Sequence, residues 1–218
     1  MNTEDFDFYL GEIINQSQLA LDAIGELNFS MSNLNRLSRQ NHRYQVFHKE
    51  IFNSIDVFLK HACTISHMLW PKISERGKND KESAGIIFCN HSDNRIIKNI
   101  KERLGHDGRQ LLMDKTLRNH FEEHLERFEL TSIESVGRFN LNGFPVFVAY
   151  SLFDRKICHY DPISRNFHFN GKTYNIQEAA AVIFKLLSYA CEKRQQRKAP
   201  ARTEFVATGQ SLQANSLV

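Results

Sequence analysis

Apolar and small residues recur about every 3.5 positions along the N-terminal part of the chain. Between Asp5 and Asn28 these positions are Phe6, Leu10, Ile13, Ser17, Ala20, Ile24 and Leu27. From Leu34 to Trp70 the same spacing continues without glycine or proline, and Pro71 then ends it, because proline cannot continue a helix. The pattern predicts two helices with one buried stripe each. The second, if unbroken, is roughly 55 Å long at about 1.5 Å per residue.

The next segment is polar and then returns to a helical pattern. The stretch "PKISERGKNDKESAG" is charged, has two glycines and lacks a period, which predicts an exposed loop. Ser92 or Asp93 can cap a short helix that reaches Leu104 and is closed by Gly105. After "HDG" we expect a helix from about Arg109 to Phe128. Together these helical segments predict a bundle.

The composition changes after Ser132, where aromatic and β-branched residues become frequent. Two such segments, "RFNLNGFPVFVAY" and "RNFHFNGKTYNI", each have Asn-Gly at their centre, which is a strong hairpin signal. The chain returns to helix at Asn175, which can cap it, with Glu178 three residues on as in a capping box.

We therefore predict a mainly α fold, in which a single helical-bundle domain covers residues 1–197. A small β-hairpin element at residues 133–175 is inserted before the last helix. Residues 198–218 are polar and are expected to form a disordered tail.

Composition narrows the class of protein. With 218 residues and 41% hydrophobic content, the chain can bury one ordinary core. Its four cysteines are far apart and form no Cys-x-x-Cys, which argues against a disulfide framework or a cysteine zinc site. No basic apolar leader and no run of eighteen apolar residues occur. We expect a soluble cytoplasmic protein with no membrane partner.

The formal net charge of +3 is too small to indicate a nucleic-acid-binding protein by itself. Basic residues do cluster near the end of the last helix, at Lys193, Arg194 and Arg197. They are candidate RNA contacts. The cluster is equally typical of a solvated helix end that runs into a polar tail.

The stretch "LRNHFEEHLERF" holds the candidate chemistry of the chain. At about 100° per residue, four residues of this predicted helix fall within about 60° of arc: Leu117, Phe121, His124 and Phe128. His124 thus lies in the middle of the buried stripe, with His120 about 40° to one side. Arg118 flanks the other edge, and Glu123 points away from the core.

The stretch also contains "HFEEH", the spacing of a zinc peptidase helix. His120 and His124 lie one turn apart and can ligate one Zn²⁺, with Glu123 as base. A third ligand is missing, because His61 and His67 are about 120° apart on their own helix. We therefore expect no metal and no cofactor.

A purely structural role is a further interpretation, in which His124 is an interior histidine and Arg118 with Asn119 anchors the helix by hydrogen bonds. Ribonuclease chemistry is the third. Metal-free RNA cleavage needs a group that takes a proton from the ribose 2′-OH and a fixed cation on the phosphate. Histidine and arginine supply these properties.

"LRNHFEEHLERF", late in a helical bundle, resembles the signature of HEPN proteins, and with "HYDPISRNFHFNGKTYNI" it looks most like the abortive-infection, AbiU-like branch. The resemblance implies a metal-independent endoribonuclease that dimerises through its motif helices and forms a composite site in the cleft. It implies a toxin or antiviral defence effector, with RNA as substrate and an antitoxin or defence-system protein as a further partner. Inactive members that only bind are the alternative: a helical module for RNA, nucleotide or a partner protein.

Carried over residue by residue, Arg118 would bind the phosphate, Asn119 would be the adjoining polar residue and His124 the catalytic histidine. The sequence departs from that branch at one place. There the histidine commonly stands five positions after the arginine, and that position here is Glu123. His120, one turn before His124, is a candidate to support it.

Overall fold

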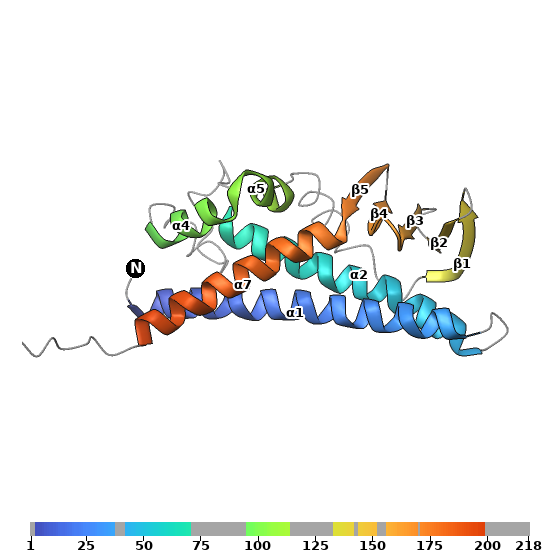
Figure 1. The fold of residues 1–218 in the computed structure, drawn as a ribbon, viewed down its shortest axis with the longest axis horizontal. Helices are drawn as coiled ribbons and strands as arrows, with labels where there is room; N and C mark the ends of the chain where they lie inside the picture. The colour runs from blue at the N-terminus through green and yellow to red at the C-terminus, as the bar shows by residue number, and fades with distance from the viewer. Residues whose placement is uncertain are drawn as a thin grey trace, which may run out of the picture.

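The computed structural model describes residues 3–37, 42–70, 95–113, 133–141, 144–151, 156–169 and 171–198. In these ranges the chain is mainly helical, as predicted, with one antiparallel sheet (Figure 1). The two longest helices form the base of the molecule, the last helix lies across them, and the sheet sits at one end.

The base is an antiparallel pair, α1 (Thr3–Arg36) and α2 (His42–Leu69). The phenol of Tyr9, near the start of α1, donates to the carbonyl oxygen of Met68, near the end of α2, at 2.8 Å. The predicted boundaries were wrong here. The first helix does not end near Asn28, and no unbroken helix runs from Leu34 to Trp70. Leu34 is buried with α1 because its apolar stripe continues through Ser30 and Leu34.

Two short helices follow, α4 (Arg95–Arg103) and α5 (Gly105–Met113). Gly105 has the positive φ of 69° that suits glycine at a helix end, as predicted. The next helix starts at this glycine, so the prediction that it begins near Arg109 after a "HDG" loop was wrong. Gly108 lies inside α5, where an added Cβ would approach a methyl carbon of Val182 to 3.3 Å. The missing side chain therefore lets α5 pack closely on the last helix.

The β region is larger than the predicted hairpin element. Five strands form one antiparallel sheet in the order β1-β2-β3-β4-β5. They are β1 (Ile133–Leu141), β2 (Phe144–Ser151), β3 (Lys156–Asp161), β4 (Asn166–Phe169) and β5 (Lys172–Asn175). Both predicted hairpins are present as β1-β2 and β4-β5, and the element spans residues 133–175 as expected. The unpredicted strand β3 pairs with β2 and β4 and joins the hairpins into one sheet.

The last helix, α7 (Ile176–Lys198), begins where β5 ends. The backbone amide of Glu178 donates to Oδ1 of Asn175 at 3.0 Å, which confirms the predicted cap. The helix then returns along the base, so that Arg197 comes within 3.6 Å of Asp7 at the start of α1. Its buried side includes Ile176, Ala180, Ile183 and Ala190.

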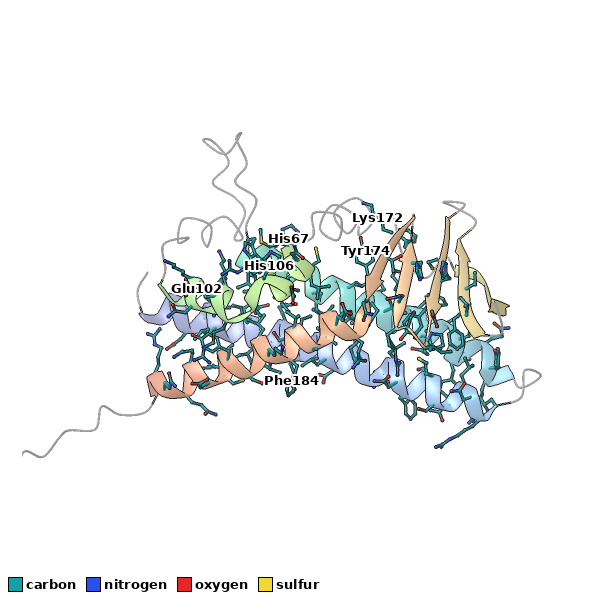
Figure 2. The ribbon with its side chains drawn as sticks, turned by 45° about the horizontal axis from the view of Figure 1, so that its top comes forward. His67, Glu102, His106, Lys172, Tyr174 and Phe184 are labelled. Carbon is teal, nitrogen blue, oxygen red and sulfur yellow. The ribbon has the colours of Figure 1, made fainter. Side chains whose placement is uncertain are left out.

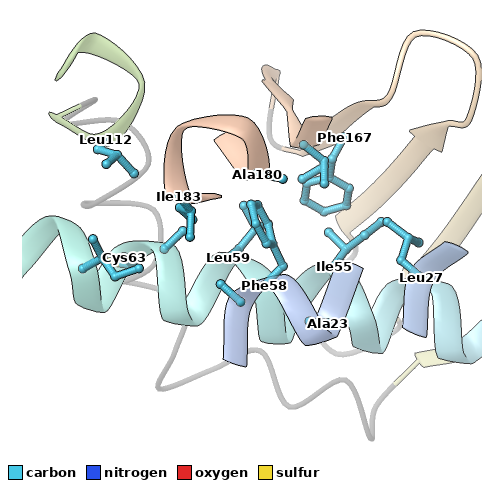
Figure 3. Close-up of a cluster of buried hydrophobic side chains, with 14 of the residues drawn as sticks. Ala23, Leu27, Ile55, Phe58, Leu59, Cys63, Leu112, Phe167, Ala180 and Ile183 are labelled. Atoms are coloured by element: carbon cyan, nitrogen blue, oxygen red, sulfur yellow. The ribbon is translucent and has the colours of Figure 1, made fainter. Parts of the chain in front are cut away.

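One continuous core joins helices and sheet (Figure 3). Leu27 of α1, Phe58 of α2, Phe167 of β4 and Ile183 of α7 meet there, and each is at most 8% exposed. Full burial of such a side chain contributes about 1.5–3 kcal/mol to folding. The sheet is therefore packed on the helices through its inner face. Among the described residues, no helix is long and apolar enough to cross a membrane.

Candidate functional site

The predicted motif residues Arg118, Asn119 and His124, together with His120 and Glu123, lie outside the described residues. Their roles, and the zinc interpretation of the same stretch, stay predictions. The candidate tail at residues 198–218 is likewise outside the described ranges, apart from Lys198. The structure does describe the elements that come before and after the motif.

The helix that leads into the motif is fixed to α2 at its end. Ser66 of α2 is fully buried, and its hydroxyl donates to the carbonyl oxygen of Leu112, one residue before α5 ends. The junction between α4 and α5 is also stabilised, because Nε of Arg109 donates to the carbonyl oxygen of Lys101 at 2.8 Å. The chain thus leaves α5 from a defined place, five residues before Arg118.

A pocket of about 400 Å³ lies beside this end of α5. Its floor is apolar and comes from α2 and α5, through Phe58, Leu59, Ala62, Leu111 and Leu112. Its other side comes from the sheet and the start of α7: Asn166, Thr173, Tyr174, Asn175, Ile176, Glu178 and Ala179. An apolar pocket with a few polar groups is the usual form of a small-molecule site.

Two of the polar side chains that line the pocket already form hydrogen bonds within the protein. Asn175 is occupied at both ends of its amide, since Oδ1 caps α7 and Nδ2 donates to the carbonyl oxygen of Ser164 at 3.2 Å. Thr173 is paired with His168, its Oγ1 lying 2.7 Å from Nδ1. The other polar side chains that line the pocket belong to Asn166, Tyr174 and the exposed Glu178.

A row of polar side chains extends from the pocket across the outer face of the sheet. His159 of β3, His168 of β4 and Thr173 of β5 are register partners across adjacent strands. Their neighbours Tyr160 and Phe167 are buried on the opposite face. The two imidazole rings stack with centroids 4.1 Å apart and planes 16° apart.

The surroundings of His159 favour its neutral form. Burial lowers the pKa of His159, the neighbouring His168 lowers it further, and Asp161 acts in the opposite direction. Burial alone would raise the pKa of Asp161, but hydrogen bonds from the hydroxyl of Ser164 and the backbone amide of Ile163 lower it overall. These bonds, at 2.6 and 2.9 Å, also shape the turn between β3 and β4.

This turn holds the sheet against α1. Arg165 has a positive φ of 59°, and its guanidinium donates to Oδ1 of Asn28 at 3.3 Å and to the phenol oxygen of Tyr160 at 3.4 Å. Its carbonyl oxygen accepts from the backbone amide of Ile176, the first residue of α7, at 3.0 Å. One residue thus joins the sheet to two helices.

The basic residues at the end of α7 are partly tied down. Arg197 pairs with Asp7, the Nζ of Lys193 lies over the ring of Tyr189 and donates to Gln196 at 2.8 Å, and Nε of Arg194 is buried. These contacts hold the three basic side chains against the rest of the protein. That these side chains bind RNA stays a prediction.

His61 of α2 forms a hydrogen bond with Gln16 of α1, and the direction of this bond is determined. Because a carboxylate can only accept, Gln16 donates its Nε2–H to Glu12 at 2.6 Å, which leaves Oε1 of Gln16 to accept. Nδ1 of His61 lies 2.6 Å from that oxygen and must donate to it. Within the described residues no group of three histidine, cysteine or acidic residues can hold a metal ion.

Among known proteins, no family model, no curated protein and no solved structure matches this chain. The functional interpretation therefore rests on the residues themselves. The sequence alone did not reveal the histidine pair or the pocket. A usable signal existed for the pair, because His159 and His168 are placed symmetrically about the Asp161–Asn166 turn.

Proposed function

We propose that this protein is a metal-independent endoribonuclease of the HEPN type, acting as a toxin or antiviral effector. One observation carries the proposal: Arg118, Asn119 and His124 follow one another in the spacing of that superfamily, late in a chain that is mainly helical. The composite site is expected in the cleft of a homodimer, in the cytoplasm, without a metal or cofactor.

The chemistry assigns a role to each residue. His124 takes the proton from a ribose 2′-OH, since imidazole titrates near neutral pH. Arg118 binds the phosphate through its planar, permanently charged guanidinium and stabilises the charge that develops there. Attack of the 2′-oxygen on the phosphorus then releases the 5′-oxygen of the next nucleotide and leaves a 2′,3′-cyclic phosphate.

The attachment of the preceding helix supports this assignment. A reacting group must be positioned accurately, and displacement of about 1 Å can reduce a rate by about a hundredfold. The buried bond from Ser66 to Leu112 fixes the chain just before the motif begins. The pocket beside Leu112 offers space for part of a substrate.

An RNA cleavage assay with EDTA tests the proposal. Wild-type protein should cut RNA in the chelator and leave 2′,3′-cyclic ends, while Arg118→Ala and His124→Ala should lose at least a hundredfold of the rate. Matched controls are Arg36→Ala, which is exposed and distant in sequence from the motif, and His106→Ala, which is exposed on α5 twelve residues before Arg118. Unimpaired cleavage by both motif variants would refute the site. Loss of cleavage in EDTA, restored by zinc, would favour the zinc enzyme.

A second candidate function is a catalytically inactive helical module that binds RNA, nucleotide or a partner protein. The observation that favours it is Glu123 at the position where the related branch carries histidine. The double variant Glu123→His with His124→Glu restores that register. Binding without cleavage by the wild type, with cleavage gained by the double variant, would support the inactive module.

A further inference from the structure

We infer that the pocket beside the end of α5 is a binding site for a single guanine base, held through Glu178. Its volume of about 400 Å³ lies within the usual range of about 300–1,000 Å³ for small-molecule sites. As the base site of an RNA substrate this assignment rests on the proposed ribonuclease function. Nucleotide binding to the pocket is measurable without any cleavage.

The apolar part of the pocket suits the flat faces of a base. Leu111 of α5 and Ala179 of α7 line it with half-buried side chains. Phe58, Leu59 and Leu112, all labelled in Figure 3, line it from α2 and α5 as core side chains that are at most 3% exposed. Tyr174 borders it from β5, close to the helices in Figure 2. Proteins that bind single-stranded RNA commonly place splayed bases against such side chains and bond to their edges.

The polar groups of the pocket select among the bases. Glu178 offers a carboxylate, which only accepts hydrogen bonds and binds best to two adjacent donors. Guanine alone presents such a pair on its Watson–Crick edge, N1–H beside the N2 amine. Adenine and cytosine each place an acceptor beside their single amine, and uracil has one donor between two acceptors. The carboxylate is therefore complementary to guanine.

The phosphate of a nucleotide bound in this pocket can lie away from the carboxylate of Glu178. Thr173 borders the pocket and contacts His168, which begins the histidine row on the outer sheet face. Lys172, exposed and adjacent to Thr173, stands at the outer end of β5 (Figure 2). A cation and two imidazole rings thus line the way out of the pocket, where a polyanion can pass.

A second pocket also contains a carboxylate, but it is not complementary to guanine in this way. The groove of about 320 Å³ between α4 and α7 contains Glu192, but that carboxylate already lies 3.9 Å from the guanidinium of Arg103. Arg103 in turn covers the ring of Tyr189, with 4.7 Å between its central carbon and the ring centroid. Glu192 is therefore engaged by Arg103 and also accepts from Gln196, whereas Glu178 lines a pocket with an apolar floor.

Isothermal titration calorimetry of the full chain with 3′-GMP, 3′-IMP, 3′-AMP, 3′-CMP and 3′-UMP tests the inference. We expect 3′-GMP to bind at least tenfold tighter than 3′-AMP, 3′-CMP and 3′-UMP. Because 3′-IMP keeps N1–H but lacks the N2 amine, it should bind about tenfold more weakly than 3′-GMP, the usual effect of one lost bond to a charged group. Equal affinity for all five, or no binding of any, would overturn the guanine site.

Two variants locate the binding. Glu178→Gln keeps a residue that capping boxes accept at this position but offers only one acceptor, so the preference for 3′-GMP should fall at least tenfold. Ala179→Leu keeps the carboxylate and fills pocket space, so all binding should weaken. The matched control is Glu102→Gln, an exposed carboxylate on α4, which should bind like the wild type. Retained 3′-GMP preference in Glu178→Gln, or wild-type affinity in Ala179→Leu, would overturn the assignment.

Cleavage data separate the two proposals. Selective 3′-GMP binding in a protein that never cuts RNA keeps the pocket and removes the ribonuclease. Cutting of RNA with no base preference, together with no selective nucleotide binding, keeps the ribonuclease and removes the guanine pocket.

Discussion

His159 and His168 stand opposite one another on β3 and β4 with their imidazole rings stacked, the centroids 4.1 Å apart. Two cationic rings at this distance would repel, so the arrangement favours at least one neutral ring. The pair also borders Thr173, and through it the pocket that we assign to a base. Protonation of His159 is therefore linked to the stability of the sheet.

The first prediction follows from the pKa of His159, which burial and His168 lower below its ordinary value of 6.5. The unfolded chain then binds the proton more readily than the folded one, so stability is present above about pH 6.5 and is lost as the pH falls further. Between pH 7.5 and 5.5 the melting temperature should fall more for wild type than for His159→Gln. Equal falls would contradict the linkage, since other titrating groups are common to both proteins.

Asp56 on α2 gives the opposite dependence. Burial raises its pKa from 3.8 to about 6, against the influence of Lys60, so the folded state loses stability as the pH rises from about 3.8 to about 6. We expect Asp56→Asn to raise the free energy of unfolding by about 1–3 kcal/mol at pH 7. The gain should vanish below the ordinary pKa of 3.8. Urea titrations at several pH values measure it, with exposed Asp22→Asn as the control that should change little.

The bond from Ser66 to the carbonyl oxygen of Leu112 should matter for both stability and activity. Ser66→Ala leaves a carbonyl without its buried donor, which costs about 1–3 kcal/mol. Thr64→Ala on the same helix is the control, because its hydroxyl bonds to Lys60 at an exposed site. If the bond positions the motif, RNA cleavage by Ser66→Ala should fall at temperatures where the protein is still folded. Unchanged cleavage there would limit the bond to stability.

Two substitutions at Arg165 can distinguish the cost of its positive φ from the loss of its side-chain hydrogen bonds. Both Arg165→Gly and Arg165→Ala remove the guanidinium contacts to Asn28 and Tyr160, but only alanine keeps a Cβ at a φ of 59°. Since that conformation costs about 1–2 kcal/mol for an L-residue, and glycine has more entropy to lose, the glycine variant should be more stable by about 0.5–1 kcal/mol. Chemical denaturation compares the pair, and a more stable alanine variant would contradict the strain.

Core packing between the sheet and the helices gives a further test. Phe58 is fully buried between elements that are distant in the sequence, so Phe58→Ala should cost about 3–5 kcal/mol. Phe184, on α7, is 60% exposed and points away from the base in Figure 2, so Phe184→Ala should change stability by less than about 1 kcal/mol. Similar losses for both would contradict the packing.

The sequence by itself determined what depends on near neighbours. The 3.5-residue spacing predicted the helical stripes, the Asn-Gly pairs predicted both hairpins, and Asn175 was correctly expected to cap the last helix. The boundary beyond Asn28 and the start of α5 were wrong, because a helix continues where its stripe finds partners. The motif at Arg118, Asn119 and His124 is a sequence prediction that lies outside the described residues.

Tertiary structure decided what depends on distant segments. Strand β3 is short, and its pairing on both sides joins two hairpins into one sheet. The stack of His159 on His168 requires that register, and the pocket requires α2, α5, β4, β5 and α7 to meet. The pocket is fixed by burial against partners far along the chain, and no local spacing of residues encodes it.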